Sequence, residues 1–105
     1  MIMTTVQVQK NDATVTLEGA LTVALAQELR PQLQKALAEG VSSVVFDLGR
    51  ADVVDSSGIG LLIATHNSLK TKGGRLRVAN ASPEIINLFK AMRLDRHFSV
   101  EGRQA

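Results

Sequence analysis

The spacing of apolar residues changes its period several times along the chain, and the order of these changes restricts the fold more than any single motif does. Residues 6–9 and 13–18 alternate apolar with polar side chains, as strands do, and Asn11-Asp12 predicts a turn between them. Residues 23–39 carry apolar side chains at helical spacing, behind a predicted N-cap at Thr22 and before a terminating Gly40. The predicted order continues as strand, helix, strand, helix and short edge strand, at residues 44–48, 57–71, 75–78, 82–92 and 97–100.

This order of elements predicts the fold class. Helices between strands require parallel pairing with right-handed crossovers, whereas the opening pair of strands forms an antiparallel hairpin. We therefore expect an α/β fold: a small mixed β-sheet with an N-terminal antiparallel hairpin, then parallel strands with alternating helices. With 105 residues, of which 45% are hydrophobic, the chain fits a single domain over residues 1–105.

Two details of this fold follow from local sequence. The run Val44-Val45-Phe46 with Leu48 is nearly continuous and rich in β-branched residues, which indicates a central strand buried on both faces. Pro31 lies well inside the first predicted helix, where it lacks an N–H and crowds the preceding turn. We expect a kink or a break there, near residues 27–30.

Composition limits the location and the partners of the chain. It contains no cysteine, so disulfides and thiolate chemistry are excluded and a reduced cytoplasm is favoured. No basic segment followed by an apolar block opens the chain, and no stretch approaches the roughly 18 apolar residues of a membrane span. We therefore expect a cytoplasmic protein without a membrane span.

The charges are unevenly distributed. The net charge is +2, but residues 1–55 carry seven acidic and four basic side chains, whereas residues 56–105 carry three acidic and eight basic ones. A basic half can bind nucleic acid, yet the aromatic residues are only Phe46, Phe89 and Phe98, all in apolar surroundings, which leaves no stacking platform for bases. Direct nucleic-acid binding is therefore not expected.

The stretch from Asp47 to Gly60 joins the central strand to the second helix and is the most unusual part of the sequence. Its acidic and hydroxyl side chains converge where a helix N-terminus exposes free N–H groups and a partial positive charge. The simplest interpretation is that Asp55, Ser56 or Ser57 caps the helix. Ser56 is expected at the turn, outside the first helical residues, and Ser57 nearer the helix.

Enzymatic sites fit this stretch poorly. A hydrolase elbow needs glycine two residues before and after the serine, and neither serine meets that requirement. His66 lies about ten residues along the same helix from Ser56, roughly 15 Å away, and is more simply a partly buried core residue. No dinucleotide fingerprint or Walker lysine is present, so Gly58 and Gly60 are interpreted as packing positions against the sheet.

Metal binding is also weakly supported by the sequence. Asp47, Asp52 and Asp55 could in principle hold Mg²⁺, but acids in a loop before a helix are more often solvated or capping. We expect no metal, no cofactor and no catalytic residue. His97 is distant in sequence, and its position relative to the serines is left open.

A specific resemblance rests on four segments of the sequence. Residues 55–62 read Asp-Ser-Ser-Gly-Ile-Gly-Leu-Leu, residues 44–48 read Val-Val-Phe-Asp-Leu, and Gly73-Gly74-Arg75-Leu76 and Ser82-Pro83 follow. Together they resemble the STAS domain, in particular the bacterial anti-sigma factor antagonists, and the resemblance extends from about Glu18 to Phe98.

The resemblance implies a partner-switching protein. Such antagonists bind an ATP-binding serine kinase that is also the anti-sigma factor, and the kinase phosphorylates the serine directly after the Asp of the motif, which is Ser56 here. A serine phosphatase is implied as the second partner. Many members have Asp where this chain has Thr22. Thr22 is thus a departure from the family pattern, and the usual acid-rich partner surface lacks one carboxylate here. The predicted partner-binding residues are Thr22, Asp52, Asp55, Ser56, Ser57 and Gly58.

Three functions are therefore compared. The first is an anti-sigma factor antagonist controlled by phosphorylation of Ser56. The second is a STAS accessory subunit of a transport or signalling assembly, acting as a constitutive docking module in which Ser56 is only a cap. The third, an enzyme or small-ligand protein, has no assembled nucleophile and base to support it. The Asp55-Ser56 pair favours the first.

Overall fold

The computed structural model describes residues 4–103 and contains one five-stranded sheet with three α-helices and a short 3₁₀ helix among these residues. In chain order the elements are β1 (Thr5–Gln9), β2 (Asp12–Thr16), α1 (Val23–Ala38), β3 (Ser43–Asp47), α2 (Ser56–Lys70), β4 (Arg75–Ala81), α3 (Pro83–Ala91), the 3₁₀ helix η1 (Leu94–Arg96) and β5 (Ser99–Gly102).

The sheet has the strand order β1-β2-β3-β4-β5, the same as the order along the chain. β1 and β2 are antiparallel, and the pairs β2–β3, β3–β4 and β4–β5 are parallel. The predicted mixed sheet, with its opening hairpin followed by parallel strands, is confirmed.

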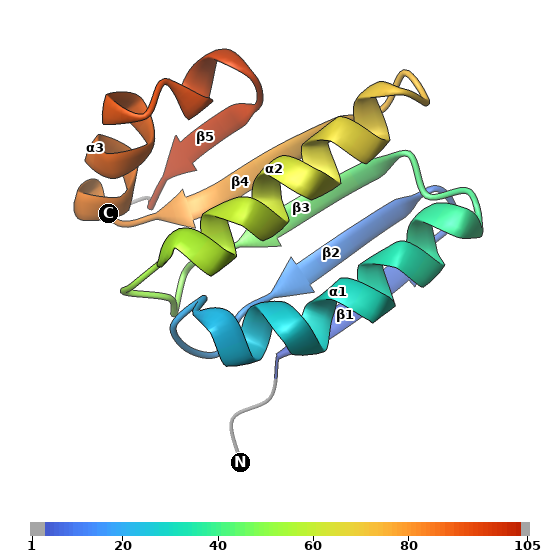
Figure 1. Ribbon diagram of the computed structural model, residues 1–105, viewed down its shortest axis with the longest axis horizontal. Helices are drawn as coiled ribbons and strands as arrows, with labels where there is room; N and C mark the ends of the chain where they lie inside the picture. Colours follow the sequence, from blue (N-terminus) through green and yellow to red (C-terminus); the bar gives the residue numbers. More distant parts are fainter. Residues whose placement is uncertain (1–3, 104–105) are drawn as a thin grey trace.

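The sequential strand order places the helices on one face of the sheet. Each crossover from β2 onward moves in the same direction, and a right-handed crossover in a constant direction always returns over the same face. Figure 1 shows α1 and α2 side by side in front of the sheet, with α3 beside β5. The opposite face is therefore left without a helix in the described part of the chain.

The burial of β3 follows from this one-sided arrangement. Phe46 lies in register with Val15 and Val78, and all three side chains are fully buried beneath the helices. The preceding residue, Val45, points to the opposite face, where it is half-buried beside the exposed Arg77. The prediction that the central strand is buried on both faces is wrong, because a continuous apolar run does not reveal the strand order.

The expected break in the first helix is also absent. α1 is continuous from Val23 to Ala38 with Pro31 inside it. Pro31 and Gln27 are both exposed, so the carbonyl that loses its helical donor is on the solvent side. Leu29 and Leu33, on the opposite side of the helix, are buried and keep α1 on the sheet.

The ends of the elements differ from prediction by up to three residues, and the largest difference is at β4, which was predicted to end at Val78 and ends at Ala81. The hairpin turn is formed by Lys10 and Asn11, with Lys10 in the left-handed region at φ 58°, and Asp12 already belongs to β2. The predicted start of α3 is confirmed, since the Ser82 hydroxyl accepts a hydrogen bond from the N–H of Ile85 at 3.2 Å. None of the helices among residues 4–103 has the length and apolar character needed to cross a membrane.

Candidate functional site

The predicted site residues lie at the carboxyl edge of the parallel strands, where the connections after β2 and β3 run side by side. Leu21, between β2 and α1, forms a parallel bridge with Val54, between β3 and α2. The N–H of Leu21 donates to the carbonyl of Val53 at 2.8 Å, and the N–H of Asp55 donates to the carbonyl of Leu21 at 3.1 Å. These bonds hold the first turns of α1 and α2 next to each other.

Gly58 makes this close approach sterically feasible. A Cβ on Gly58 would lie 2.4 Å from the carbonyl oxygen of Leu21 and 2.7 Å from its Cγ. Around Gly60, by contrast, no heavy atom would lie within 4 Å of a Cβ. The interpretation of both glycines as packing positions is therefore right for Gly58 and wrong for Gly60.

The cap of α2 is Asp55. Its Oδ1 accepts a hydrogen bond from the N–H of Gly58 at 3.0 Å, and its carbonyl accepts one from Ile59 at 2.9 Å. Ser56 is exposed and is the first helical residue, and Ser57 is half-buried in the next position. The prediction that Ser56 lies outside the helix is wrong, because Asp55 occupies the N-cap and the helix begins directly after it.

Both serine hydroxyls remain available for chemistry. Among the hydrogen bonds between residues 4–103, none involves the side chain of Ser56 or Ser57. The Asp55 carboxylate already provides the cap, so the structure gives the exposed Ser56 hydroxyl no capping function. It stands at the positive end of the α2 dipole, among the N–H groups of the first turn.

The other two acids of the stretch face different environments. Asp47 accepts hydrogen bonds from the N–H of Gly49 at 2.9 Å and from the side-chain amide of Asn80 at 3.0 Å. The side chain of Asp52 is 85% exposed and lies 3.5 Å from the guanidinium of Arg103. No group of three or more His, Asp or Glu side chains within residues 4–103 is placed to hold a metal ion.

Thr22 occupies the N-cap position of α1, as predicted, but its side chain makes no capping hydrogen bond. It is half-buried and follows Leu21, so it lies beside the first turn of α2. The structure thus brings Thr22 together with Asp55, Ser56 and the residues after it. Asp52 stands outside this group, on the exposed part of the loop.

Two apolar residues near Ser56 were not predicted as part of the site. Val23, the first residue of α1, is 51% exposed, and Val53, just before the α2 cap, is 54% exposed. A shallow cavity of about 320 Å³ lies between the amino-terminal halves of the two helices, lined by Val23, Ala26, Gln27, Arg30, Ser57 and Gly60. The sequence offered one signal for them: Val23 and Val53 are apolar at positions where neither the helical nor the strand periodicity requires an apolar residue.

Comparison with known proteins identifies the family. The STAS domain family matches residues 3–103. The anti-sigma-B factor antagonist of Bacillus subtilis (strain 168) is 33% identical to this chain over 84 residues, which cover 80% of this chain and 76% of that protein.

The fold also matches solved structures. The Bacillus cell fate determinant SpoIIAA in its phosphorylated form has a TM-score of 0.77 at 22% identity, covering 93% of this chain and 90% of that one. In its unphosphorylated form the TM-score is 0.75 at 23% identity, with 90% and 96% covered. A sulfate transporter family protein from Wolinella succinogenes has a TM-score of 0.75 at 16% identity, with 90% and 80% covered.

These matches define an α/β domain of the STAS class, and this chain belongs to the STAS domain family. The resemblance to the anti-sigma factor antagonists of that family, predicted from residues 55–62 and their neighbours, is confirmed by the Bacillus subtilis relative.

Proposed function

We propose that this chain is an anti-sigma factor antagonist whose binding to its partner is controlled by phosphorylation of Ser56. The partner is an anti-sigma factor that is also an ATP-binding serine kinase, and a serine phosphatase restores the unmodified form. The observation that carries this proposal is the exposed Ser56 hydroxyl, which takes no part in capping α2 because Asp55 does so.

The position of Ser56 makes phosphorylation compatible with the fold. A phosphate adds a charge of about −1.5 to −2 at pH 7. At the first residue of α2 this charge faces the positive end of the helix dipole, which favours negative groups. The cap bond from Gly58 to Asp55 does not involve Ser56, so it does not have to break. We therefore expect the modified domain to keep its structure.

The same charge opposes docking of a protein partner. The unmodified surface around Ser56 presents the half-exposed Val23 and Val53, which a partner can cover at little cost in desolvation. A phosphate beside Asp55 would place a strongly hydrated dianion in the middle of that surface. Removing this dianion from water costs roughly several kcal/mol unless the partner supplies a positive charge to pair with it. Phosphorylation therefore weakens binding without unfolding the domain.

Four further residues, Thr22, Asp52, Asp55 and Ser57, complete the proposed docking surface. Thr22 lies beside the first turn of α2 with no capping bond of its own, so its hydroxyl is available to the partner. Ser57 forms the α2 side of the same surface, while Asp52 provides an exposed carboxylate at its edge, and Asp55 sets the orientation of the first turn. Gly58 is buried, so it contributes only by letting α2 approach Leu21 closely.

We further propose that the domain is not an enzyme. His66 is ten residues from Ser56 along α2, about 15 Å. The ring of His97 lies 5.9 Å from that of His66, so it is at the same distant end of α2. Neither imidazole can act as a base toward Ser56. A cytoplasmic location, favoured by the absence of cysteine, belongs to the same proposal.

The second candidate is a constitutive docking subunit of a transport or signalling assembly. It is favoured by the fold shared with the Wolinella succinogenes sulfate transporter family protein, although at 16% identity this likeness concerns the fold alone. The two candidates differ in one respect: the switch requires Ser56 to be modified, whereas a docking subunit uses Ser56 unmodified throughout.

A paired pull-down from the source cells separates the two candidates. The wild-type chain and Ser56→Glu serve as baits, with Ser68→Glu as a matched control, because Ser68 is an exposed serine about three turns farther along α2 and outside the proposed docking surface. The switch predicts that wild type recovers an ATP-binding kinase and that Ser56→Glu recovers much less of it. Recovery of a membrane transport component in equal amounts by wild type and Ser56→Glu would contradict the proposal.

A further inference from the structure

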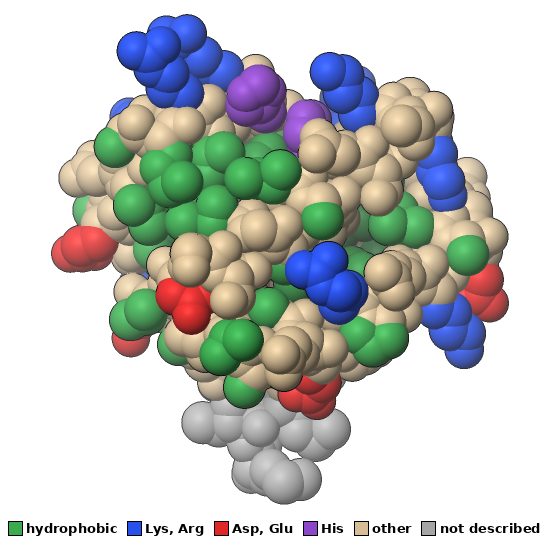
Figure 2. Space-filling model, in the orientation of Figure 1, with side chains coloured by type: hydrophobic (Ala, Val, Ile, Leu, Met, Phe, Trp, Pro, Cys, Tyr) green, Lys and Arg blue, Asp and Glu red, His purple; other side chains and the backbone are tan. Residues whose placement is uncertain are grey.

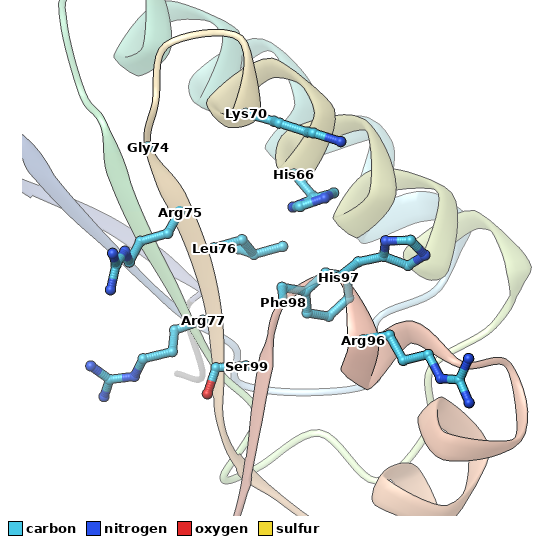
Figure 3. Close-up of a pocket in the computed structure, with 10 residues that line it drawn as sticks. All are labelled: His66, Lys70, Gly74, Arg75, Leu76, Arg77, Arg96, His97, Phe98 and Ser99. Atoms are coloured by element: carbon cyan, nitrogen blue, oxygen red, sulfur yellow. The ribbon is translucent and has the colours of Figure 1, made fainter.

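A cavity lies at the opposite end of α2 from Ser56. It measures about 540 Å³ and is bounded by the last turns of α2, the start of β4 and the segment that leads from η1 into β5. β5 pairs with β4 only from Arg77 onward, where Arg77 lies opposite Ser99. The first residues of β4, Arg75 and Leu76, therefore have no strand on that side, and this missing pairing opens the cavity (Figure 3).

Three basic side chains are placed around this opening. His66 and Lys70 come from one face of α2, four residues apart, and His97 comes from the other wall. The rings of His66 and His97 are 5.9 Å apart between centroids, and Figure 3 shows the Lys70 side chain extending from α2 beside His66. Figure 2 shows the two histidines next to each other, with lysine and arginine side chains on either side and no acidic side chain beside them in that view.

The remaining charged residues around the cavity do not neutralise this group. Arg75 and Arg77 extend from β4 toward the other side of the strand, and Arg96 runs outward from η1 (Figure 3). Glu101 on β5 pairs with Arg77 at 2.6 Å. None of the residues that line the cavity carries a carboxylate.

Electrostatics within the cavity disfavour a further positive charge. The pKa of His66 is lowered from its ordinary value, first because burial removes water from the imidazole, and then because His97 and Lys70 repel its charged form. A bound anion would reverse both repulsive contributions, since it attracts each of the three groups. The geometry agrees with this, since the three groups share a cavity whose lining has no carboxylate to offset their charge.

The floor of the cavity is apolar and aromatic. Leu76 and Phe98 are both buried, and the ring of Phe98 lies 5.7 Å from the ring of His66. Phe98 is itself held by Phe89, edge to face at 6.3 Å. A ligand with a flat or apolar body can rest against this fixed surface while its charged group stays near the mouth.

We propose that this cavity binds a small phosphate monoester, with the phosphate between Lys70, His66 and His97 and the organic group against Phe98 and Leu76. The three basic groups supply charge-assisted hydrogen bonds to the phosphate oxygens. Because the cavity is at the far end of α2 from Ser56, this site is separate from the proposed phosphorylation switch.

Phenyl phosphate is a suitable probe, since it combines the charge with an aromatic body. The full chain is titrated with it at about pH 6.5, and the imidazole proton resonances of His66 and His97 are followed by NMR. We expect both resonances to shift together with one dissociation constant, and we expect the lowered pKa of His66 to rise in the complex, because the phosphate favours the charged imidazole. Unchanged resonances at millimolar phenyl phosphate would overturn the proposal.

Two lysines two residues apart provide a matched pair of variants, Lys70 at the end of α2 and Lys72 in the turn after it. Lys70→Gln removes a group that lines the cavity, and we expect binding to weaken about tenfold. Lys72→Gln removes the same charge, but the Lys72 amine donates to the carbonyl of Leu37 in α1 and lies outside the cavity. The dissociation constant of phenyl phosphate for this variant should therefore stay within about twofold of the wild-type value. Equal weakening by both variants would show nonspecific attraction and contradict the site.

Two further arms test the parts of the cavity separately. Inorganic phosphate lacks the organic group, and we expect it to bind at least about fivefold more weakly than phenyl phosphate, since it leaves the floor uncovered. Equal affinity for the two would contradict the assignment of Phe98 and Leu76. His66→Gln keeps the approximate size and polarity of the side chain but cannot gain a proton. We expect this variant to bind phenyl phosphate more weakly than wild type. Unchanged affinity in this variant would overturn the role of His66.

Discussion

The contrast between Gly58 and Gly60 yields a sharp test of how the candidate site is built. The two glycines are in the same helix, two residues apart, and differ in what a methyl group would meet. In Gly58→Ala the added Cβ would lie 2.4 Å from the carbonyl oxygen of Leu21, which is backbone and cannot rotate away. In Gly60→Ala it would meet nothing within 4 Å.

The expected energies have opposite signs. Replacing a helical glycine by alanine contributes about 1 kcal/mol of helix propensity at either position. At Gly58 this gain is outweighed by overpacking, which costs typically 1–3 kcal/mol, and at this distance we take the upper part of that range or above. The backbone of Leu21 must also move, which strains its bonds to Val53 and Asp55. We expect Gly58→Ala to lose about 1–2 kcal/mol and Gly60→Ala to gain about 0.5–1 kcal/mol.

Equilibrium urea unfolding of wild type and both variants measures this difference. With a denaturant dependence of about 1–3 kcal/mol per molar for a small protein, the two midpoints should differ by about 1 M, Gly58→Ala below wild type and Gly60→Ala above it. Equal stabilisation by both substitutions would show that α2 does not approach Leu21 closely. Equal destabilisation would show that the space beside Gly60 is filled.

Four other outcomes follow from the structure. Phe46→Ala should lower the free energy of unfolding by about 3–5 kcal/mol in denaturant melts, because it empties a fully buried position, and a loss below about 1 kcal/mol would mean that β3 is misplaced. Asp55→Ala should lose about 0.5–2 kcal/mol in the same assay and Asp55→Asn much less, since asparagine also caps; equal losses would exclude the cap bond. Ser56→Ala should leave the thermal midpoint near that of wild type, because no hydrogen bond among the described residues uses its hydroxyl, and a large drop would give Ser56 a structural role. The lowered pKa of His66 means that the folded state resists protonation of this imidazole. The contribution of His66 to stability should therefore be full above about pH 6.5 and should fall as the pH drops from there toward the folded-state pKa. His66→Gln should flatten this part of the pH profile, and an unchanged profile would show that protonation of His66 does not cause the loss of stability.

The sequence predicted the elements because their signals are local. Alternation along β1 and β2, helical spacing in α1, and the Ser82-Pro83 start of α3 each depend on neighbours within one or two turns, and all three are present. The strand order is not local, since any of several orders satisfies the same pattern. For that reason the uncovered face beside Val45 was not foreseen.

The candidate site was predicted in part for the same reason. The Asp-Ser-Ser-Gly motif located the amino end of α2, but only the packing against Leu21 distinguishes Gly58 from Gly60. Val23 and Val53 join the site through the bridge between two connections that are distant in sequence. The pairing of His66 with His97 across a cavity likewise depends on where β5 begins, which no local pattern indicates.

The central claim is that a phosphate on Ser56 removes partner binding and leaves the fold intact. Calorimetric titration of the cognate kinase with unmodified and phosphorylated chain, after peptide mapping of the phosphate, tests it directly, with Ser57→Ala as a control that should still be modified. We predict one phosphate, located on Ser56, at least about tenfold weaker binding of the modified form, and thermal midpoints that agree closely. Phosphate on another residue, or equal dissociation constants for the two forms, would contradict the account.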